Sequence, residues 1–154
     1  MTVKQLNNLD MLAAKHILEL PRWDDGPLTQ NGPCYRQDLP SGGVVTYDRP
    51  YHGKGFSAML WEPTRDLNHC AEMDAVIWEK YRAFFYVERT NRMPSDGVEK
   101  LDKPWTAHYR GGAHPQAFAY AETQSLACVI AALRYVLGDQ LFETVLRETG
   151  VELR

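Results

Sequence analysis

The chain has 154 residues, of which 44% are hydrophobic and 24% are charged, a balance typical of globular domains rather than disordered, collagen-like or coiled-coil chains. This length predicts one domain spanning residues 1–154, with enough core to fold without a disulfide or a metal. The 17 basic and 20 acidic side chains give a net charge of -3, which excludes a chain that wraps nucleic acid by positive charge alone.

The N-terminal segment has the pattern of an amphipathic helix. Apolar residues recur at steps of three and four residues up to Leu20, and Thr2 with Gln5 has the spacing of a capping box. A proline follows and is expected to end the helix. Prolines and glycines then break any period, and a short edge strand over residues 34–39 is the most that this stretch allows.

Strands and helices are interspersed over the rest of the chain. We expect strands over residues 43–47, 55–61, 82–90 and 104–110, helices over 66–81 and 123–137, and a short closing helix capped by Asp139. Strands that follow one another through loops favour antiparallel pairing. The elements together predict an α+β fold, a small mainly antiparallel sheet with helices on both faces, which is an α/β/α sandwich.

Two segments carry a family resemblance. Trp61–Leu67 resembles the aromatic-x-Pro-Ser/Thr-x-Asp helix start of small bacteriophage proteins, and Ala119–Arg134 resembles their C-terminal helix, with Trp105–Ala107 in the preceding strand. Over residues 57–138 the chain is therefore similar to the phage ABA-sandwich domain family, which includes the NinX-like proteins. The resemblance implies a helix-sheet-helix sandwich and a phage or prophage origin, and it brings no catalytic residues.

The cysteines indicate reduced thiols. Cys34, Cys70 and Cys128 are far apart and form no CxxC pair, which favours a cytoplasmic location over a disulfide framework. No signal-peptide core and no stretch approaching about 18 apolar residues is present, so no membrane segment is expected. Cys70 falls in the first turn of a predicted helix, where a thiolate is favoured, yet it also occupies the apolar stripe. We expect a structural thiol there and predict no catalytic residue.

No pair of histidines or cysteines in the sequence has the HxxxH or CxxC spacing of a metal site. His52, His69, His108 and His114 form no HxxxH pair that would place two histidines on one helix face. His108 and His114 can approach each other across a glycine turn, but surface histidines are the commoner case. We expect neither a metal nor a cofactor.

Two glycine-containing turns combine cations with aromatic residues. The first carries Arg49, His52 and Lys54, and the second carries Arg110 and His114. If both turns lie at one end of the sheet, they form a basic pocket suited to a phosphate, a nucleotide or a single strand. The alternative is a pair of solvated turns in which glycine supplies a positive φ.

The aromatic residues point to a partner. Trp61 and Trp105 are expected in the core, whereas Trp78, Tyr81 and Phe85 are candidates for a binding or dimerisation face, because aromatic residues are enriched at interface hot spots.

These patterns and the resemblance predict a cytoplasmic, non-enzymatic phage accessory protein that binds a host protein, such as a component of antiviral defence. The alternative is a nucleotide or phosphate-ligand binding protein, or a weak enzyme, that uses the two glycine turns. A simple homodimer is the third possibility.

Overall fold

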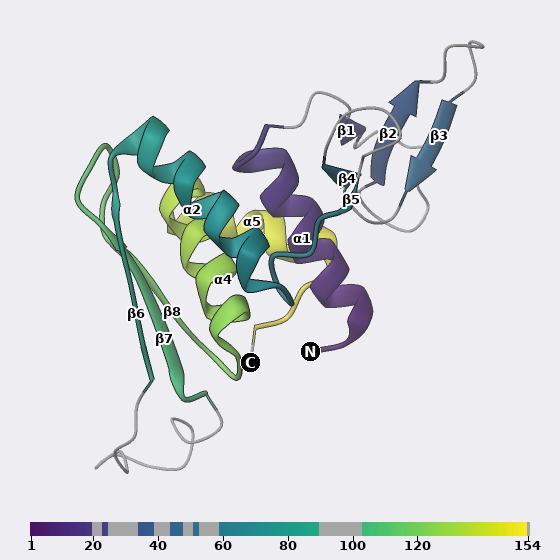
Figure 1. Cartoon of the computed structure of the whole chain (residues 1–154). Coiled ribbons are helices and arrows are strands. Elements are labelled where there is room, and N and C mark those ends of the chain that lie inside the picture. Colours follow the sequence, from purple (N-terminus) through teal and green to yellow (C-terminus); the bar gives the residue numbers. More distant parts are fainter. Residues whose placement is uncertain are drawn as a thin grey trace.

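The computed structural model describes residues 1–19, 23–24, 34–38, 44–47, 51–52, 59–89 and 103–153. The elements are, in chain order, α1 (Val3–His16), β1 (Trp23–Asp24), β2 (Cys34–Asp38), β3 (Val44–Tyr47), β4 (Tyr51–His52), β5 (Met59–Leu60), α2 (Leu67–Tyr81), β6 (Phe84–Arg89), β7 (Trp105–Arg110), β8 (Ala117–Ala121), α4 (Gln124–Leu137) and α5 (Asp139–Thr149). The helices and the sheet β6–β7–β8 form the main body (Figure 1).

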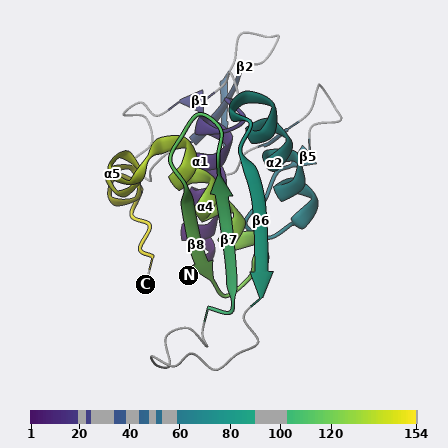
Figure 2. The same ribbon diagram turned by 90° about the vertical axis from the view of Figure 1, so that its left-hand side faces the viewer.

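The main sheet is a three-stranded antiparallel meander with β7 in the middle. Its register places Tyr86 of β6 opposite His108 of β7, and His108 opposite Phe118 of β8. Figures 1 and 2 show α2 and α4 on one face of this sheet, α1 behind α4, and the other face open toward the viewer of Figure 2. The smaller strands form two further antiparallel groups, β1–β2–β3 and β4–β5.

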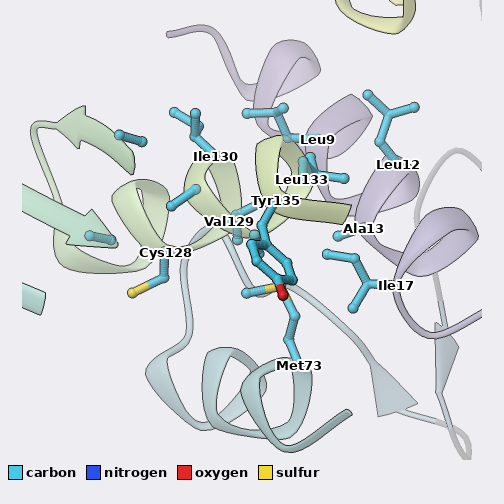
Figure 3. Packing of buried hydrophobic residues seen from close by; sticks show 14 of the residues in the cluster. Leu9, Leu12, Ala13, Ile17, Met73, Cys128, Val129, Ile130, Leu133 and Tyr135 are labelled. Atoms are coloured by element: carbon cyan, nitrogen blue, oxygen red, sulfur yellow. The ribbon is translucent and has the colours of Figure 1, made fainter. Parts of the chain in front are cut away.

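Helix α4 is the centre of the core. It contacts β7, β8, α1, α2 and α5, and most of its side chains are buried, including Val129, Leu133 and Tyr135. Figure 3 shows these side chains meeting Leu9 of α1 and Met73 of α2. The sheet side of α4 faces alanines, because all three inward positions of β8 are alanine. Small side chains on this face let the helix backbone approach the sheet closely.

A buried carboxylate fixes α1 to the start of α2. Asp10 is 1% exposed and accepts hydrogen bonds from the backbone N–H of Thr64 at 2.8 Å and from its hydroxyl at 3.0 Å. The guanidinium of Arg65 also donates to Asp10, at 3.0 Å. Burial raises the pKa of Asp10, and these donors oppose that shift. Such a satisfied carboxylate holds two elements in one relative position.

The predicted helices are confirmed, with shifts at their ends. Thr2 and Gln5 form the expected capping box, and Asp66 caps α2. The start of α5 differs from the prediction, because Gly138 is its N-cap and Asp139 is its first residue. Among the described helices none alone is long and apolar enough to cross a membrane, and α4 with α5 passes that test only as a pair bent by 119°.

The α+β class is confirmed, with helices packed against a small antiparallel sheet. The layers differ from the expected sandwich, since the described helices lie on one face of β6–β7–β8 only (Figure 2). The strand pairing also differs. Residues 34–39 were predicted as an edge strand, whereas β2 is the middle strand between β1 and β3. Met59–Leu60 pairs with Tyr51–His52 rather than with residues 43–47.

The close contact between α4 and the sheet predicts intolerance of larger inward residues. Replacing Ala119, which is 1% exposed, by leucine is expected to lower the free energy of unfolding by about 1–3 kcal/mol, because overpacking forces the helix away. Urea unfolding measures this change. The matched control Tyr120→Leu, on the open face, is expected to change stability by at most about 0.5 kcal/mol. Equal stability of Ala119→Leu and the parent chain would contradict the close packing.

Candidate interaction surface

The open face of the main sheet carries aromatic side chains. Strand β8 alternates between buried alanines and the exposed Phe118 and Tyr120, and β6 likewise exposes Phe84 and Tyr86. Successive residues of a strand point to opposite faces, so these rings share one face. We use the term aromatic face for Phe84, Tyr86, His108, Phe118, Tyr120 and the adjoining Trp78. The exposed fractions are 62% for Phe84, 50% for Tyr86, 46% for Phe118 and Tyr120, and 43% for Trp78.

The rings on the aromatic face support one another. Tyr86, His108 and Phe118 form a row across the three strands, with ring centroids 5.7 Å and 6.0 Å apart. Tyr120 meets Phe118 edge to face, with centroids 5.8 Å apart. Contacts of this kind restrict each ring before any partner arrives, which lowers the entropy lost on binding.

Trp78 extends the aromatic face beyond the sheet. It lies on α2, with its ring 5.4 Å from that of Phe84, and the guanidinium of Arg82 lies 5.4 Å from the Trp78 ring centroid. Arg82 adopts a left-handed conformation, with φ 56°, where the chain leaves α2 and enters β6. This turn places the tryptophan beside the first ring of the strand.

The turn between β7 and β8 holds the end of α2 in place. Gly112 has a φ of 69°, and a Cβ there would lie 2.0 Å from the carbonyl oxygen of Tyr81. Ala113 N–H donates to this same oxygen at 3.1 Å. Only glycine fits this approach and this φ. The second glycine turn of the sequence therefore has a packing role, since it anchors the helix that carries Trp78.

Charges are divided between the two ends of the aromatic face. Arg82 and Arg110 lie at the end where β6 begins, because Phe84 pairs with Arg110. Glu88 lies at the opposite end and accepts a hydrogen bond from the hydroxyl of Tyr86 at 2.8 Å. This hydrogen bond raises the pKa of Tyr86, with the charge of Glu88 as the next cause. The neighbouring Arg89 points to the opposite side of β6, where its guanidinium lies 5.8 Å from the Trp105 ring centroid. Among the described residues, the face therefore carries positive charge at one end and the negative charge of Glu88 at the other.

The predicted ligand residues are dispersed where the structure describes them. Arg110 is exposed at the basic end of the aromatic face, and the His114 ring packs against Tyr81, with centroids 4.9 Å apart. His52 belongs to β4, which lies across the helices from the β7–β8 turn (Figure 1). The structure does not bring His52 beside Arg110 and His114. Arg49 and Lys54 lie outside the described residues, and their role stays a prediction.

The predicted partner residues separate into different surroundings. Trp78 is exposed, Tyr81 is half-buried against Tyr135, and Phe85 points inward, with its ring centroid 5.0 Å from that of Tyr109. Phe84, the neighbour of Phe85, is the ring on the aromatic face. The alternation of a strand could have separated Phe84 from Phe85, because successive residues point to opposite faces and Phe85 shares the inward side with Val87. Trp61 is buried and Trp105 packs against the core, as predicted.

The interior thiols are protected. Cys70 donates to the carbonyl of Pro63 at 2.8 Å, and a hydrogen bond with Cys128, followed by burial, raises the pKa of the Cys70 thiol. Burial likewise raises the pKa of Tyr109 and of Asp74. A raised pKa disfavours the thiolate, which is the nucleophilic form. The geometry agrees with a structural thiol at Cys70. Within the described ranges, no group of three or more His, Cys, Asp or Glu residues is placed to hold a metal ion.

Comparisons with protein-family models, with curated proteins and with solved structures found no match. The resemblance to the phage ABA-sandwich family therefore stays a prediction. Within its two segments, Asp66 is a helix cap as the motif implies, whereas Ala119–Ala121 lies in β8 and the following helix begins at Gln124. The periodicity of the residues placed this helix from residue 123 onward, and only the resemblance extended it back to Ala119.

The protection of the thiols has a direct test. In native protein at mildly alkaline pH, iodoacetamide is expected to leave Cys70 and Cys128 unlabelled, because both are buried and free. Peptide mass spectrometry reads the two sites separately. Both should label fully in guanidinium chloride, which serves as the control. Labelling of native Cys70 as fast as that of glutathione would show an accessible, reactive thiol.

Proposed function

We propose that this chain acts by binding another protein, without enzymatic chemistry, and that the aromatic face is its working surface. The observation that carries the proposal is the arrangement of β8. Its alanines face the core, and its large apolar rings face solvent. Ordinary one-sided sheets place their large apolar residues inward and polar residues outward. In β8 the small residues face inward and the large apolar residues face outward, and this reversal fits a strand whose outer face is covered during function.

The size of the aromatic face supports a macromolecular partner. Five rings that are each about half exposed present on the order of 500 Å². Exposed apolar patches of roughly 300–600 Å² on a single chain are often functional. The surface hollows beside the end of β8 have volumes of about 180 Å³ and 280 Å³. Pockets that enclose drug-sized ligands are larger, at roughly 300–1,000 Å³.

The chemistry of the face favours a protein over a nucleic acid. Single-strand binding surfaces combine stacked aromatics with a continuous positive groove. Among the described residues of this face, Arg82 and Arg110 lie at one end and Glu88 lies at the other, so these charges do not form a continuous positive groove. Tryptophan, tyrosine and arginine are the residues that dominate protein interfaces. The mixed charge and the aromatic centre together match a protein surface.

The biological setting of the proposal rests on the resemblance. A phage or prophage accessory protein in the cytoplasm of a bacterial host would use such a face to engage a host protein, for example a defence component. The thiol of Cys70 is buried and its pKa is raised, which is compatible with a role in binding rather than in catalysis.

The test compares two surface variants in affinity capture from bacterial lysate. Phe118→Ser removes the central ring of β8, whereas Leu141→Ser makes a similar change at an exposed position of α5, 50% exposed. Both should keep the parent's stability within about 0.5 kcal/mol. Wild type and Leu141→Ser are expected to retain the same protein partner, and Phe118→Ser should bind it at least tenfold more weakly.

Hydrogen exchange of the complex then locates the contact. Protection is expected on β6, β7 and β8, because these strands carry the face. A partner that Phe118→Ser binds as tightly as wild type would contradict the proposal. So would tight, sequence-independent binding of single-stranded DNA or RNA, measured by fluorescence anisotropy and lost in Phe118→Ser.

A further inference from the structure

The aromatic face has the features of a self-complementary surface. Its centre is the row of Tyr86, His108 and Phe118, which lies midway along the strands. Its ends carry opposite charge. Arg110 lies two residues along β7 from His108, and Glu88 lies two residues along β6 from Tyr86, at the opposite end of the face. A surface of this kind can pair with its own copy if a two-fold rotation exchanges the ends.

Two orientations place two such sheets face to face with aligned strands. A two-fold axis parallel to the strands superposes like ends, so the arginines of one copy meet those of the other. An axis perpendicular to the strands, lying between the sheets, superposes unlike ends. Arg110 of one copy then lies near Glu88 of the second copy, and the reciprocal pair forms at the other end. Charge complementarity selects the second orientation, because like charges brought together at an interface cost several kcal/mol.

We propose that a second copy of this chain covers the aromatic face, in a face-to-face dimer with antiparallel strand directions. This inference rests on the proposed function, since it names the first occupant of the same surface. Packed sheets lie about 10 Å apart, which leaves room for the rings of both copies to interdigitate. Tyr86 and Phe118 then pack near their own counterparts at the centre of the dimer.

The rings supply more than half of the area that each partner buries in a dimer of standard size. The rings contribute on the order of 500 Å² per copy, and the exposed side chains of Arg82, Arg110 and Glu88 extend the surface at its rim. A stable interface of standard size buries about 800 Å² per partner, with an apolar centre and a polar rim. The aromatic face has this organisation.

The dimer also explains how the chain keeps such a face in solution. Large exposed apolar patches promote aggregation unless they are covered. A two-fold dimer closes on itself and leaves no copy of the face exposed. A host protein that uses the same face must displace the second copy, so the complex with a host protein contains one chain rather than two.

A charge swap tests the arrangement. Light scattering coupled to size exclusion should give twice the chain mass of 17.6 kDa for wild type at high concentration. Arg110→Glu and Glu88→Arg each place like charges together, and each should weaken dimerisation at least tenfold. The double variant Arg110→Glu with Glu88→Arg recreates the opposite-charge pairs and should restore the dimer. Arg147→Glu, a matched charge reversal on α5, should leave the mass unchanged.

The outcomes separate this inference from the proposed function. Wild type that stays monomeric at every concentration overturns the dimer, as does a dimer that Phe118→Ser and both single charge variants leave intact. Failure of the double variant to recover, with its fold intact by circular dichroism, also overturns the antiparallel arrangement. These measurements use the purified chain alone, so they do not depend on finding a host protein. Conversely, loss of binding between Phe118→Ser and a host protein is measured by affinity capture and does not depend on the mass found by light scattering.

Discussion

The close approach of α4 to the main sheet is the constraint on which the rest of the structure depends. Alanines occupy the inward positions of β8, and Ala107 occupies an inward position of β7. At β8 this contact leaves no room for large side chains between strand and helix, so the rings of β8 lie on the other face. At β7 the inward Tyr109 packs instead against Tyr135 of α4, with ring centroids 5.9 Å apart. Burying small residues yields less hydrophobic stabilisation per residue than burying large ones. The chain compensates by packing other helices around α4, with α2 beside it and α1 behind it (Figure 3).

The elements around α4 make the aromatic face rigid. Gly112 lets the β7–β8 turn contact the end of α2, and Asp10 holds α1 against the start of α2. Tyr135 of α4 donates a hydrogen bond to the carbonyl of Gly111 at 2.8 Å, which ties the same turn to the central helix. A surface held in this way loses little conformational freedom on binding. The same contacts around α4 therefore make the core rigid and hold the open face in a fixed conformation before it binds.

Much of the fold was predictable from local patterns, and the layer order was not. Helix periods and caps are local properties. Thr2 caps its helix as expected, and Asp66 and Thr123, the first residues predicted for their helices, are the N-caps of α2 and α4. Strand β8 was not predicted, because alanine is depleted in strands, and without this strand its outward rings were not recognised as a surface. Trp78 was predicted to bind a partner because aromatic residues are enriched at interface hot spots, and its side chain is exposed. Strand pairing depends on long-range contacts, so the partner of β5 could not be read from its neighbours in the chain.

The central claim is that the aromatic face is covered when the protein functions. Hydroxyl-radical footprinting tests it most directly, by comparing oxidation of Phe118 and Tyr120 in dilute purified protein with oxidation in the cells that contain it. Leu141, which is similarly exposed and lies outside the face, is the internal reference. The account predicts several-fold protection of both rings in cells and none at Leu141. Equal oxidation of the rings in both settings would show an uncovered face and would contradict the account.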